Sequence, residues 1–214
     1  MSVGFSQVLL TAENLEEEQK REFLTYIHER GMALADIVSD LLDIARIESG
    51  QGLPLKLEPY GSLDLTAQLN RLVPGFGGDH RFDILLEELP CNLRVDGRRM
   101  TQVLENLLSN AIKYSPGGGA IRIEGKLAGG EYRLAVIDRG IGMSPEQVVR
   151  VFDKFYRADA TDTAQEGIGL GMSIVKYIIE GHGGRTWVES APQQGTSVYF
   201  TLPLDTAVAG REAV

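Results

Sequence analysis

Three polar residues recur at helical spacing within ENLLSNAIKYSP, the stretch that covers residues 105–116. Asn106, Asn110 and Lys113 lie four and three positions apart, so a helix places all three side chains on one face. Amide oxygens suit a hard cation such as magnesium, which keeps several waters and takes oxygens from substrate phosphates, and a lysine adds positive charge beside it. The spacing therefore indicates a helix with something polar opposite this face, and the residue types would suit a metal-bound phosphate group.

Glycine-bearing stretches follow this helix in the order DRGIGM (138–143), GIGLGMS (167–173) and GTSVYF (195–200). Glycine lets a backbone approach a ligand closely, and GIGLGMS leads into a predicted helix whose free amides favour an anion such as phosphate. Taken singly, each stretch is also what an ordinary turn after a strand contains. GIGLGMS matches neither the dinucleotide fingerprint G-x-G-x-x-G nor the GK[ST] of a phosphate-binding loop, which disfavours two common nucleotide folds.

Asp138 stands at the end of an apolar stretch, immediately before the first of these glycine turns. A carboxylate there is able to accept a hydrogen bond from an exocyclic amine, which is what a buried adenine requires. The alternative is that Asp138 caps the turn RGIGM. The residue types alone leave both roles open.

The composition is that of an ordinary globular chain, with 214 residues, of which 43% are hydrophobic and 24% charged. The formal charge of −9 and the lack of a Lys/Arg cluster argue against nucleic acid as a partner. A single cysteine allows no internal disulfide, which fits a reducing compartment. No apolar run is long enough to span a membrane and no signal peptide is recognisable, so we expect no membrane contact and a cytoplasmic location.

The N-terminal segment predicts a short helix near 3–10 and a long helix over 15–49. Asn14 is the expected N-cap of the long helix, with Glu17 at its capping-box position. Apolar residues recur along this helix in steps of three and four, which makes a seam for another helix. A hairpin with one short arm leaves that seam uncovered, so we expect pairing with a second copy or with further sequence.

A Gly- and Pro-containing linker at 49–62 places a domain boundary near Gly52. The pattern beyond it predicts helices at 63–72, 98–114, after Pro145 and at 173–180, and strands at 82–86, 92–95, 120–127, 131–137, 186–189 and 196–202. The expected fold is a two-layer α/β sandwich, a mixed, mostly antiparallel sheet with helices on one face, preceded by a helical hairpin. The expected division is 1–52, 53–205 and a frayed tail at 206–214.

Four of these stretches together resemble a known family. ENLLSNAIKYSP, DRGIGM, FDKFYR and GIGLGMSIVKYIIEGHGG resemble, in order and spacing, the N, G1, F and G2 boxes of bacterial sensor histidine kinases, and GTSVYFTLP is similar to the G3 segment. The resemblance implies that residues 53–205 are the ATP-binding catalytic domain, of the gyrase, chaperone, histidine-kinase and mismatch-repair ATPase superfamily. The stretch ending DLLDIARIESG resembles the second helix of the family's dimerisation and phosphoacceptor domain.

Carried over by position, the resemblance implies that Asn110 is the principal magnesium ligand, with Asn106 close by and Lys113 on the phosphates of ATP. It places Tyr114 against the adenine and Asp138 on the adenine amino group. The further nucleotide contacts that it implies are Gly140, Gly142, Lys154, Arg157, Gly167, Gly169, Leu170, Gly171 and Thr196.

The resemblance also concerns the segment between the F and G2 boxes. Residues 158–166, ADATDTAQE, are small and polar, as a mobile lid over the nucleotide should be. Phe152 and Phe155 match the F box, and plain core packing beneath the lid explains them equally well. The implied partners are ATP with magnesium, a response-regulator receiver domain and, in the full-length protein, a second copy.

The family transfers the γ-phosphoryl group to a histidine in a motif like H-E-x-R-T-P, which does not occur here. His28, His80 and His182 lack that context, and surface or capping roles explain them better. We therefore expect the acceptor histidine to lie outside this chain, and no autophosphorylation by the chain alone. The alternatives are an ATPase switch of the same superfamily and a non-catalytic module that senses nucleotide or binds a regulator.

Overall fold

The computed structural model describes residues 2–11, 15–76, 79–87, 93–157 and 168–204. The chain divides into two compact units, Met1–Gly50 and Gln51–Val214. Within the described ranges, none of the helices combines the length and the apolar composition that a membrane crossing requires.

The first unit consists of α1 (Ser2–Thr11) and α2 (Glu17–Glu48), which pack against each other. Glu16 is the N-cap of α2, and its N–H donates to Gln19 Oε1 at 3.3 Å. The prediction of Asn14 as the N-cap was wrong, because the helix begins two residues later than an Asn14 cap requires; Asn14 itself lies outside the described residues.

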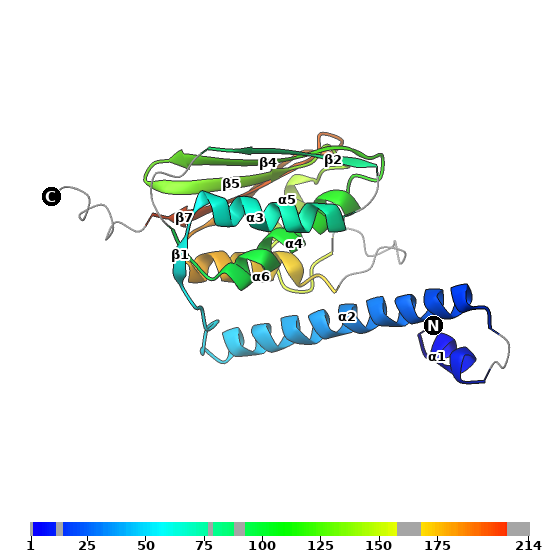
Figure 1. Ribbon diagram of the computed structural model, residues 1–214. Helices are drawn as coiled ribbons and strands as arrows, with labels where there is room; N and C mark the ends of the chain where they lie inside the picture. The colour runs from blue at the N-terminus through cyan, green and yellow to red at the C-terminus, as the bar shows by residue number, and fades with distance from the viewer. Residues whose placement is uncertain (1, 12–14, 77–78, 88–92, 158–167, 205–214) are drawn as a thin grey trace. The chain divides into compact units, whose positions relative to one another are not determined.

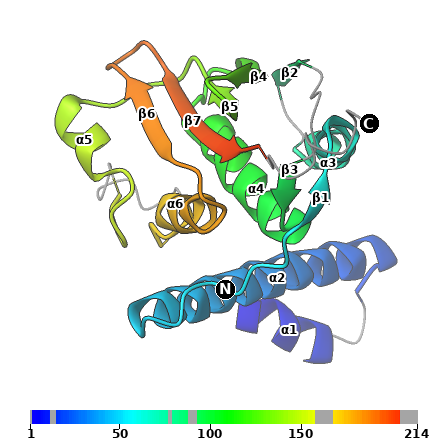
Figure 2. The ribbon, with the colours of Figure 1, turned by 90° about the vertical axis from the view of Figure 1, so that its left-hand side faces the viewer.

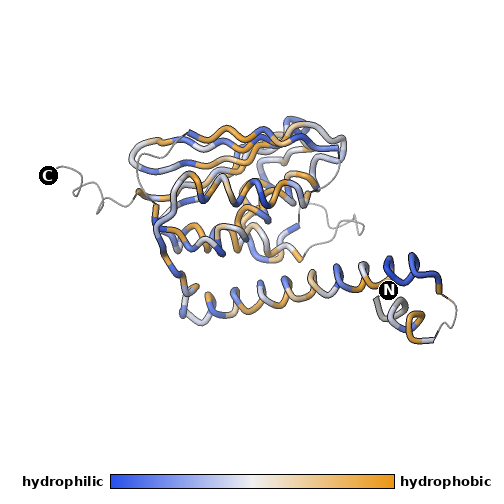
Figure 3. The backbone as a smooth tube through the Cα atoms, viewed as in Figure 1, coloured by the Kyte–Doolittle hydropathy of each residue, from blue (hydrophilic) through white to orange (hydrophobic). Residues whose placement is uncertain are grey.

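The apolar seam of α2 stays largely uncovered by α1. Leu34 is 61% and Leu41 42% exposed. Apolar and polar residues alternate along the whole length of the helix (Figure 3). The short α1 therefore leaves most of the seam open, as the sequence predicts for a hairpin with one short arm.

A five-stranded sheet of order β2-β4-β5-β7-β6 dominates the second unit (Figure 1). Its strands are β2 (His80–Leu86), β4 (Gly119–Ala128), β5 (Glu131–Ile137), β6 (Thr186–Ser190) and β7 (Thr196–Pro203). Among these described strands, β2 and β4 pair in parallel, and the other three neighbouring pairs are antiparallel. The predicted mixed, mostly antiparallel sheet is thereby confirmed.

The helices α3 (Ser62–Leu72), α4 (Gly97–Lys113) and α6 (Gly171–Gly181) lie on the same side of this sheet (Figures 1 and 2). The strands alternate accordingly: Tyr132 and Leu134 of β5 are buried beneath the helices, and Arg133 between them faces the other way. The predicted α/β sandwich with helices on one face is confirmed.

A second, two-stranded sheet pairs β1 (Glu58–Tyr60) with β3 (Leu93–Val95) in antiparallel register. The prediction that β1 belongs to the linker was wrong, because a strand of three residues that contains Pro59 shows no period-two pattern. The remaining elements are the 3₁₀ turn η1 (Val73–Gly75) and the short helix α5 (Pro145–Arg150).

Helix α4 forms because its sequence supplies both a cap and a buried face. The side chain of Asp96, the N-cap, accepts a hydrogen bond from Arg99 N at 3.1 Å. The buried residues recur at steps of three and four and include Met100, Leu104, Leu107 and Ala111. The helix ends at Lys113, and Pro116 follows shortly after it.

Candidate functional site

The polar face of α4 lies against the start of α6. The amide of Asn106 donates to Gln102 O at 3.0 Å, which leaves its Oδ1 as an acceptor. A Cβ on Gly171 would overlap Asn106 Oδ1, so the side chain of Asn106 reaches the backbone at the first residue of α6. Asn110, one turn further along α4, is half-buried and makes no side-chain hydrogen bond within the described ranges.

The first turn of α6 has no side-chain cap. Leu170, its N-cap, is 3% exposed, so the Leu170 side chain belongs to the core and only its backbone is available to a ligand. Uncapped backbone amides at a helix start favour an anion. The oxygen of Asn106 and these amides thus meet at one place, which suits a phosphate group with a cation beside it.

The end of β5 leads into the turn that carries Asp138, which is buried. Asp138 Oδ1 accepts from Gly140 N at 2.8 Å and from Thr196 N at 3.1 Å, and Asp138 N donates to Thr196 O at 2.9 Å. The hydroxyl of Thr196 is within 3.0 Å of Ser190 Oγ. Asp138 therefore does cap its turn, but it does so with one oxygen only.

Two opposing effects set the protonation of Asp138. Burial raises the pKa of this carboxyl, and the N–H groups of Gly140 and Thr196, with the hydroxyl of Ser115, partly counteract that rise. A buried carboxylate whose second oxygen receives no hydrogen bond of regular geometry within the described ranges is poised to accept one from a ligand donor.

The end of α4 is bonded to the same turn. Tyr114 O accepts from Ile141 N at 3.0 Å, and a Cβ on Gly140 would overlap that carbonyl oxygen. Gly140 is therefore required by close approach of two backbones. The ammonium group of Lys113 lies 5.1 Å from the ring centroid of Tyr114. The predicted residues Lys113, Tyr114, Asp138 and Gly140 thus come together.

The F-box stretch contacts the start of α6. Phe155 N donates to Gly169 O at 2.9 Å, and Phe155 has a φ of 62°, which is uncommon for a bulky side chain. At 57% exposed, Phe155 is not in the core, so the core-packing explanation of Phe155 was wrong; Phe152 is half-buried. The Lys154 ammonium lies 5.5 Å from the Tyr177 ring centroid.

Two further predicted site residues lie on the same stretches of chain. Arg157 is half-buried, and Gly142 adopts a φ of 65° with its backbone against Ala191 O. Gly167 and the predicted lid at 158–166 lie outside the described residues.

His28 and His182 have the surface and capping roles expected of them, His182 as the C-cap of α6, whereas His80 is half-buried at the start of β2. His28 is exposed on α2. His182 is buried: its Nε2 accepts from Asp96 N at 2.9 Å and its Nδ1 donates to Ile178 O at 2.7 Å, so it joins the end of α6 to the start of α4. His80 Nε2 lies 2.9 Å from Ser115 O.

Sequence reasoning missed Ser115 and Ser190. Ser190 Oγ accepts from Met143 N at 2.9 Å and donates to Gly195 O at 2.8 Å, which ties the turn after β5 to the start of β7. Ser190 had no signal in the sequence, because a strand-end serine is common. Ser115 had a weak one, since it follows directly after the polar helix face.

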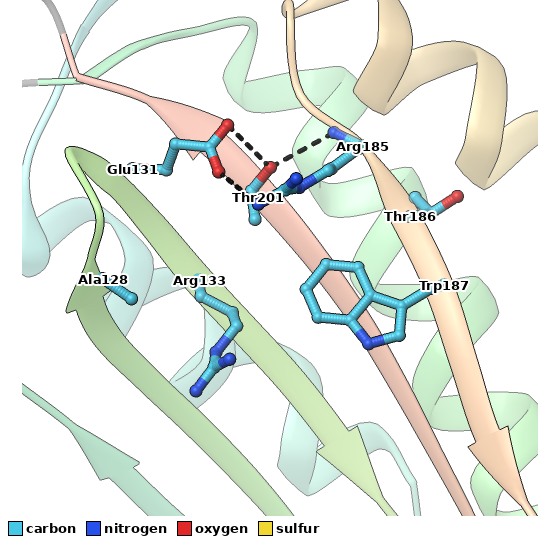
Figure 4. Close-up of a pocket in the computed structure, with 7 residues that line it drawn as sticks. All are labelled: Ala128, Glu131, Arg133, Arg185, Thr186, Trp187 and Thr201. Atoms are coloured by element: carbon cyan, nitrogen blue, oxygen red, sulfur yellow. Dashed lines mark hydrogen bonds and ion pairs between the residues drawn. The ribbon is translucent and has the colours of Figure 1, made fainter.

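A hollow of about 420 Å³ lies on the other face of the sheet, opposite the helices (Figure 4). Glu131 bonds Arg185 Nη2 at 3.0 Å and accepts from Thr201 Oγ1 at 3.3 Å, and that hydroxyl also accepts from Arg185 N at 3.2 Å. Trp187 stacks on Tyr199 with ring centroids 5.0 Å apart. Glu131, Arg185 and Thr201 are bonded to one another, which is typical of cross-strand packing on the solvent face of a sheet.

The side chains of α4 suit a magnesium ion that is bound by amide oxygens and not by a cluster of carboxylates or thiolates. In the described part of the chain, no group of three or more His, Cys, Asp or Glu is arranged to hold a metal. The oxygen of Asn106 and the amide of Asn110 are the available hard donors, and magnesium needs few protein ligands when phosphates and waters supply the rest.

Comparison with known proteins gives one family. A model described as histidine kinase-, DNA gyrase B-, and HSP90-like ATPase matches residues 95–206. An uncharacterised sensor-like histidine kinase of Rhizobium meliloti is 32% identical over 212 residues, 97% of this chain and 40% of that protein. The sensor-like histidine kinase SenX3 of Mycobacterium tuberculosis is 33% identical over 191 residues, 88% of this chain and 46% of that protein. The chain thus spans less than half the length of these curated relatives.

Solved structures agree with this family. Full-length ShkA, solved in complex with AMPPNP, has a TM-score of 0.72 at 29% identity, and the match covers 96% of this chain and 43% of ShkA. The histidine kinase AdeS of Acinetobacter baumannii has a TM-score of 0.69 at 21% identity, covers 96% of this chain and 94% of AdeS, and shares the fold. The chain therefore belongs to the histidine kinase-, DNA gyrase B-, and HSP90-like ATPase family, as the catalytic ATP-binding part of a sensor histidine kinase.

Proposed function

We propose that the second unit binds ATP and donates its γ-phosphoryl group to a histidine that lies outside this chain, for signalling to a response regulator. In that step the bond between the β–γ bridging oxygen and the γ-phosphorus breaks, a bond from an imidazole nitrogen to phosphorus forms, and ADP leaves. Phosphoryl transfer depends mainly on positioning and on charge stabilisation, which this site is built to supply.

The observation that carries the proposal is the buried carboxylate of Asp138. One of its oxygens is held by Gly140 and Thr196, and the other receives no hydrogen bond from a described residue. An adenine amino group is a donor of the kind that this second oxygen accepts. The backbone of Tyr114 is held against the same turn through Ile141 N and Gly140, so its aromatic side chain is on the segment next to Asp138, as a site for a flat base requires.

The phosphate end of the proposed site is the junction of α4 and α6. Asn110, with Asn106, would hold magnesium, which when bound neutralises phosphate charge and orients the phosphates. Lys113 would contact the phosphates, and the uncapped amides at the start of α6 would receive them. Lys154, Arg157, Gly142, Gly167, Gly169, Leu170 and Gly171 complete the proposed contacts.

Calorimetric titration of the purified chain with AMPPNP and millimolar magnesium tests this proposal. ShkA, the relative solved with that analogue, supports the choice of ligand. We expect measurable binding and an approximately 100-fold weaker affinity in Asp138→Asn, because its amide N–H₂ would face the adenine amine donor. Circular dichroism should show Asp138→Asn to be folded. Well-folded wild-type protein that gives no heat of binding would refute the proposal.

Phosphoryl transfer requires an added acceptor, because the chain lacks an H-E-x-R-T-P-like motif. A separate polypeptide carrying the first helix of the dimerisation domain should become phosphorylated with labelled ATP, and Asn110→Ala or Asn110→Asp should abolish that signal. Phosphohistidine on the chain incubated alone would show that the acceptor has been misidentified.

The wider setting is part of the same proposal. Residues 1–52 would be part of a dimerisation domain, which the open seam of α2 supports because Leu34 and Leu41 lie exposed on it. A receiver domain would be the partner that takes the phosphoryl group onward. Use of ATP as the donor is consistent with a cytoplasmic position for this part of the protein.

A further inference from the structure

Ser115 is a buried residue at the junction of α4 and the turn after β5. It follows Tyr114, the C-cap of α4, and is 3% exposed. A Cβ on Gly140 would lie 2.7 Å from Ser115 Oγ, so this hydroxyl points at the turn that Asp138 begins. The proposed nucleotide contacts do not include Ser115.

The backbone of Ser115 is fixed by three hydrogen bonds. Its N–H donates to Ile112 O at 3.1 Å, and its carbonyl oxygen accepts from Gly118 N at 3.0 Å and from His80 Nε2 at 2.9 Å. The side chain therefore has little freedom beyond rotation about its own Cα–Cβ bond.

The hydroxyl itself has no hydrogen-bond partner of regular geometry in the described part of the chain. An unbonded buried hydroxyl is costly, and such groups in native proteins need an explanation. The Asp138 carboxyl is close enough for this hydroxyl to lower its pKa, and Asp138 Oδ2 receives no hydrogen bond of regular geometry from a described residue. A donor without a regular acceptor and an acceptor without a regular donor thus lie at the same turn.

We propose that Ser115 is a positioning residue for adenine recognition, whose hydroxyl donates to Asp138 Oδ2 when nucleotide binds. This inference rests on the proposed function. The hydrogen bond would hold the carboxylate ionised and fix the direction of its remaining lone pairs toward the adenine amine. Because Ser115 Oγ is buried, it acts on the base through Asp138 and not by direct contact.

The charged state of Asp138 is what this arrangement controls. Burial raises the pKa of Asp138, and Ser115 is one of three groups that lower it, with Gly140 N and Thr196 N. A protonated Asp138 would present its own O–H to the adenine amine, so affinity should fall as the pH drops through this pKa. Loss of Ser115 should move that fall to higher pH.

Other titratable groups at this junction stay the same in both proteins that are compared. They are His80 on β2, Lys113 and Tyr114 at the end of α4, and Arg139 in the turn after β5. They are present in the wild type and in a Ser115 variant alike, so the difference between the two pH profiles reports on Ser115.

The test is calorimetric affinity for AMPPNP with magnesium between about pH 5 and 8, in the full chain. Ser115→Ala should bind about tenfold more weakly at neutral pH, the scale of one hydrogen bond to a charged group, and should lose affinity at a higher pH than the wild type does. Ser115→Thr keeps the hydroxyl and should restore both values. Ser109→Ala is the matched control, because Ser109 Oγ donates only to Asn106 O of its own helix, at 3.2 Å, and should change neither.

Purine riboside triphosphate, which lacks the 6-amino group, separates positioning from packing. If Ser115 acts through Asp138 and the amine, Ser115→Ala and the wild type should bind this analogue equally. Equal weakening of AMPPNP and of the analogue in Ser115→Ala would overturn the inference, and so would an unshifted pH profile.

Folding and the parent proposal remain separately testable. Ser115→Cys keeps the volume with a weak donor, and should fall between wild type and alanine; it decides the question if the alanine variant does not fold. If wild-type protein shows no binding, the proposed function fails first. If wild type binds and neither Ser115 variant differs from it, only the role of Ser115 fails.

Discussion

Two faces of one sheet carry concentrations of polar side chains, and they differ in how far those groups satisfy one another. On the solvent face, Glu131 accepts hydrogen bonds from both Arg185 and Thr201 (Figure 4), and the guanidinium of Arg133 lies 5.9 Å from the Tyr199 ring centroid. On the helix side, Asp138 keeps one oxygen unbonded within the described ranges and Ser115 Oγ has no partner there.

This difference in hydrogen bonding says more about ligand binding than the size of a hollow does. Evenly paired polar groups stabilise a surface and leave nothing for a ligand, whereas unpaired buried groups cost stability unless a ligand completes them. Asp96 shows the same contrast on the helix side itself, since both of its oxygens accept backbone N–H groups, of Arg99 at 3.1 Å and Lys56 at 2.9 Å. Asp96, with both oxygens hydrogen-bonded, has a structural role, whereas Asp138, with one oxygen hydrogen-bonded, lies in the proposed site.

The largest expected effect comes from Gly140→Ala, which would disrupt the close backbone contact between the end of α4 and the turn after β5. The new Cβ would overlap Tyr114 O, and neither backbone has room to retreat because Tyr114 O also accepts from Ile141 N. We expect a loss of about 2–3 kcal/mol in the free energy of unfolding, measured by urea denaturation, with loss of AMPPNP binding.

Gly117→Ala is the matched control for that variant. Gly117 lies in the loop just after α4, and a Cβ there meets nothing within 4 Å. Its stability and its nucleotide affinity should stay close to wild type. A Gly140→Ala protein as stable as Gly117→Ala would mean that the turn after β5 is looser than its contacts indicate.

The order of the elements could be predicted from the sequence because each long element carries its own period. The apolar steps of α4, through Met100, Leu104 and Leu107, gave both the helix and its polar face. The state of Asp138 could not be predicted, because it depends on Thr196, 58 residues away, and on a serine with no periodic signature. Strand β1 was not predicted, because its three residues are too few to show any period.

A smaller effect is expected from substitution of Asp96, whose two carboxylate oxygens both accept hydrogen bonds. Burial raises its pKa, but the backbone N–H groups of Lys56, Arg99 and Arg98 and the charge of Arg99 together hold the pKa below its ordinary value of 3.8. Asp96→Ala removes an N-cap and should lower the free energy of unfolding by about 1–2 kcal/mol at neutral pH.

The pH dependence of that loss follows from the sign of the shift. Because the folded-state pKa of Asp96 is lowered, its ionised form stabilises the fold above the ordinary value of 3.8, and that stabilisation is lost as the pH falls through the folded-state pKa. The difference between wild type and Asp96→Ala should therefore shrink in acid. Asp96→Asn keeps the cap without the charge and should lose less; an Asn variant as unstable as the Ala variant would show that the stabilisation comes mainly from the charge and not from the cap.

The smallest effect is expected in the solvent-face hollow, from Glu131→Gln. The Arg185 side chain of this ion pair is 72% exposed and that of Glu131 is 27% exposed, so the pair should contribute less than about 1 kcal/mol. Because the introduced amide still offers an oxygen to the hydroxyl of Thr201, most of the hydrogen bonding survives. The melting temperature should fall slightly at low salt and match wild type in about 1 M salt, where the charge is screened, while AMPPNP affinity stays within twofold at both. A tenfold change in affinity would show that the two faces of the sheet are coupled through β5, and that the pairing of Glu131 with Arg185 and Thr201 does not make the hollow functionally silent.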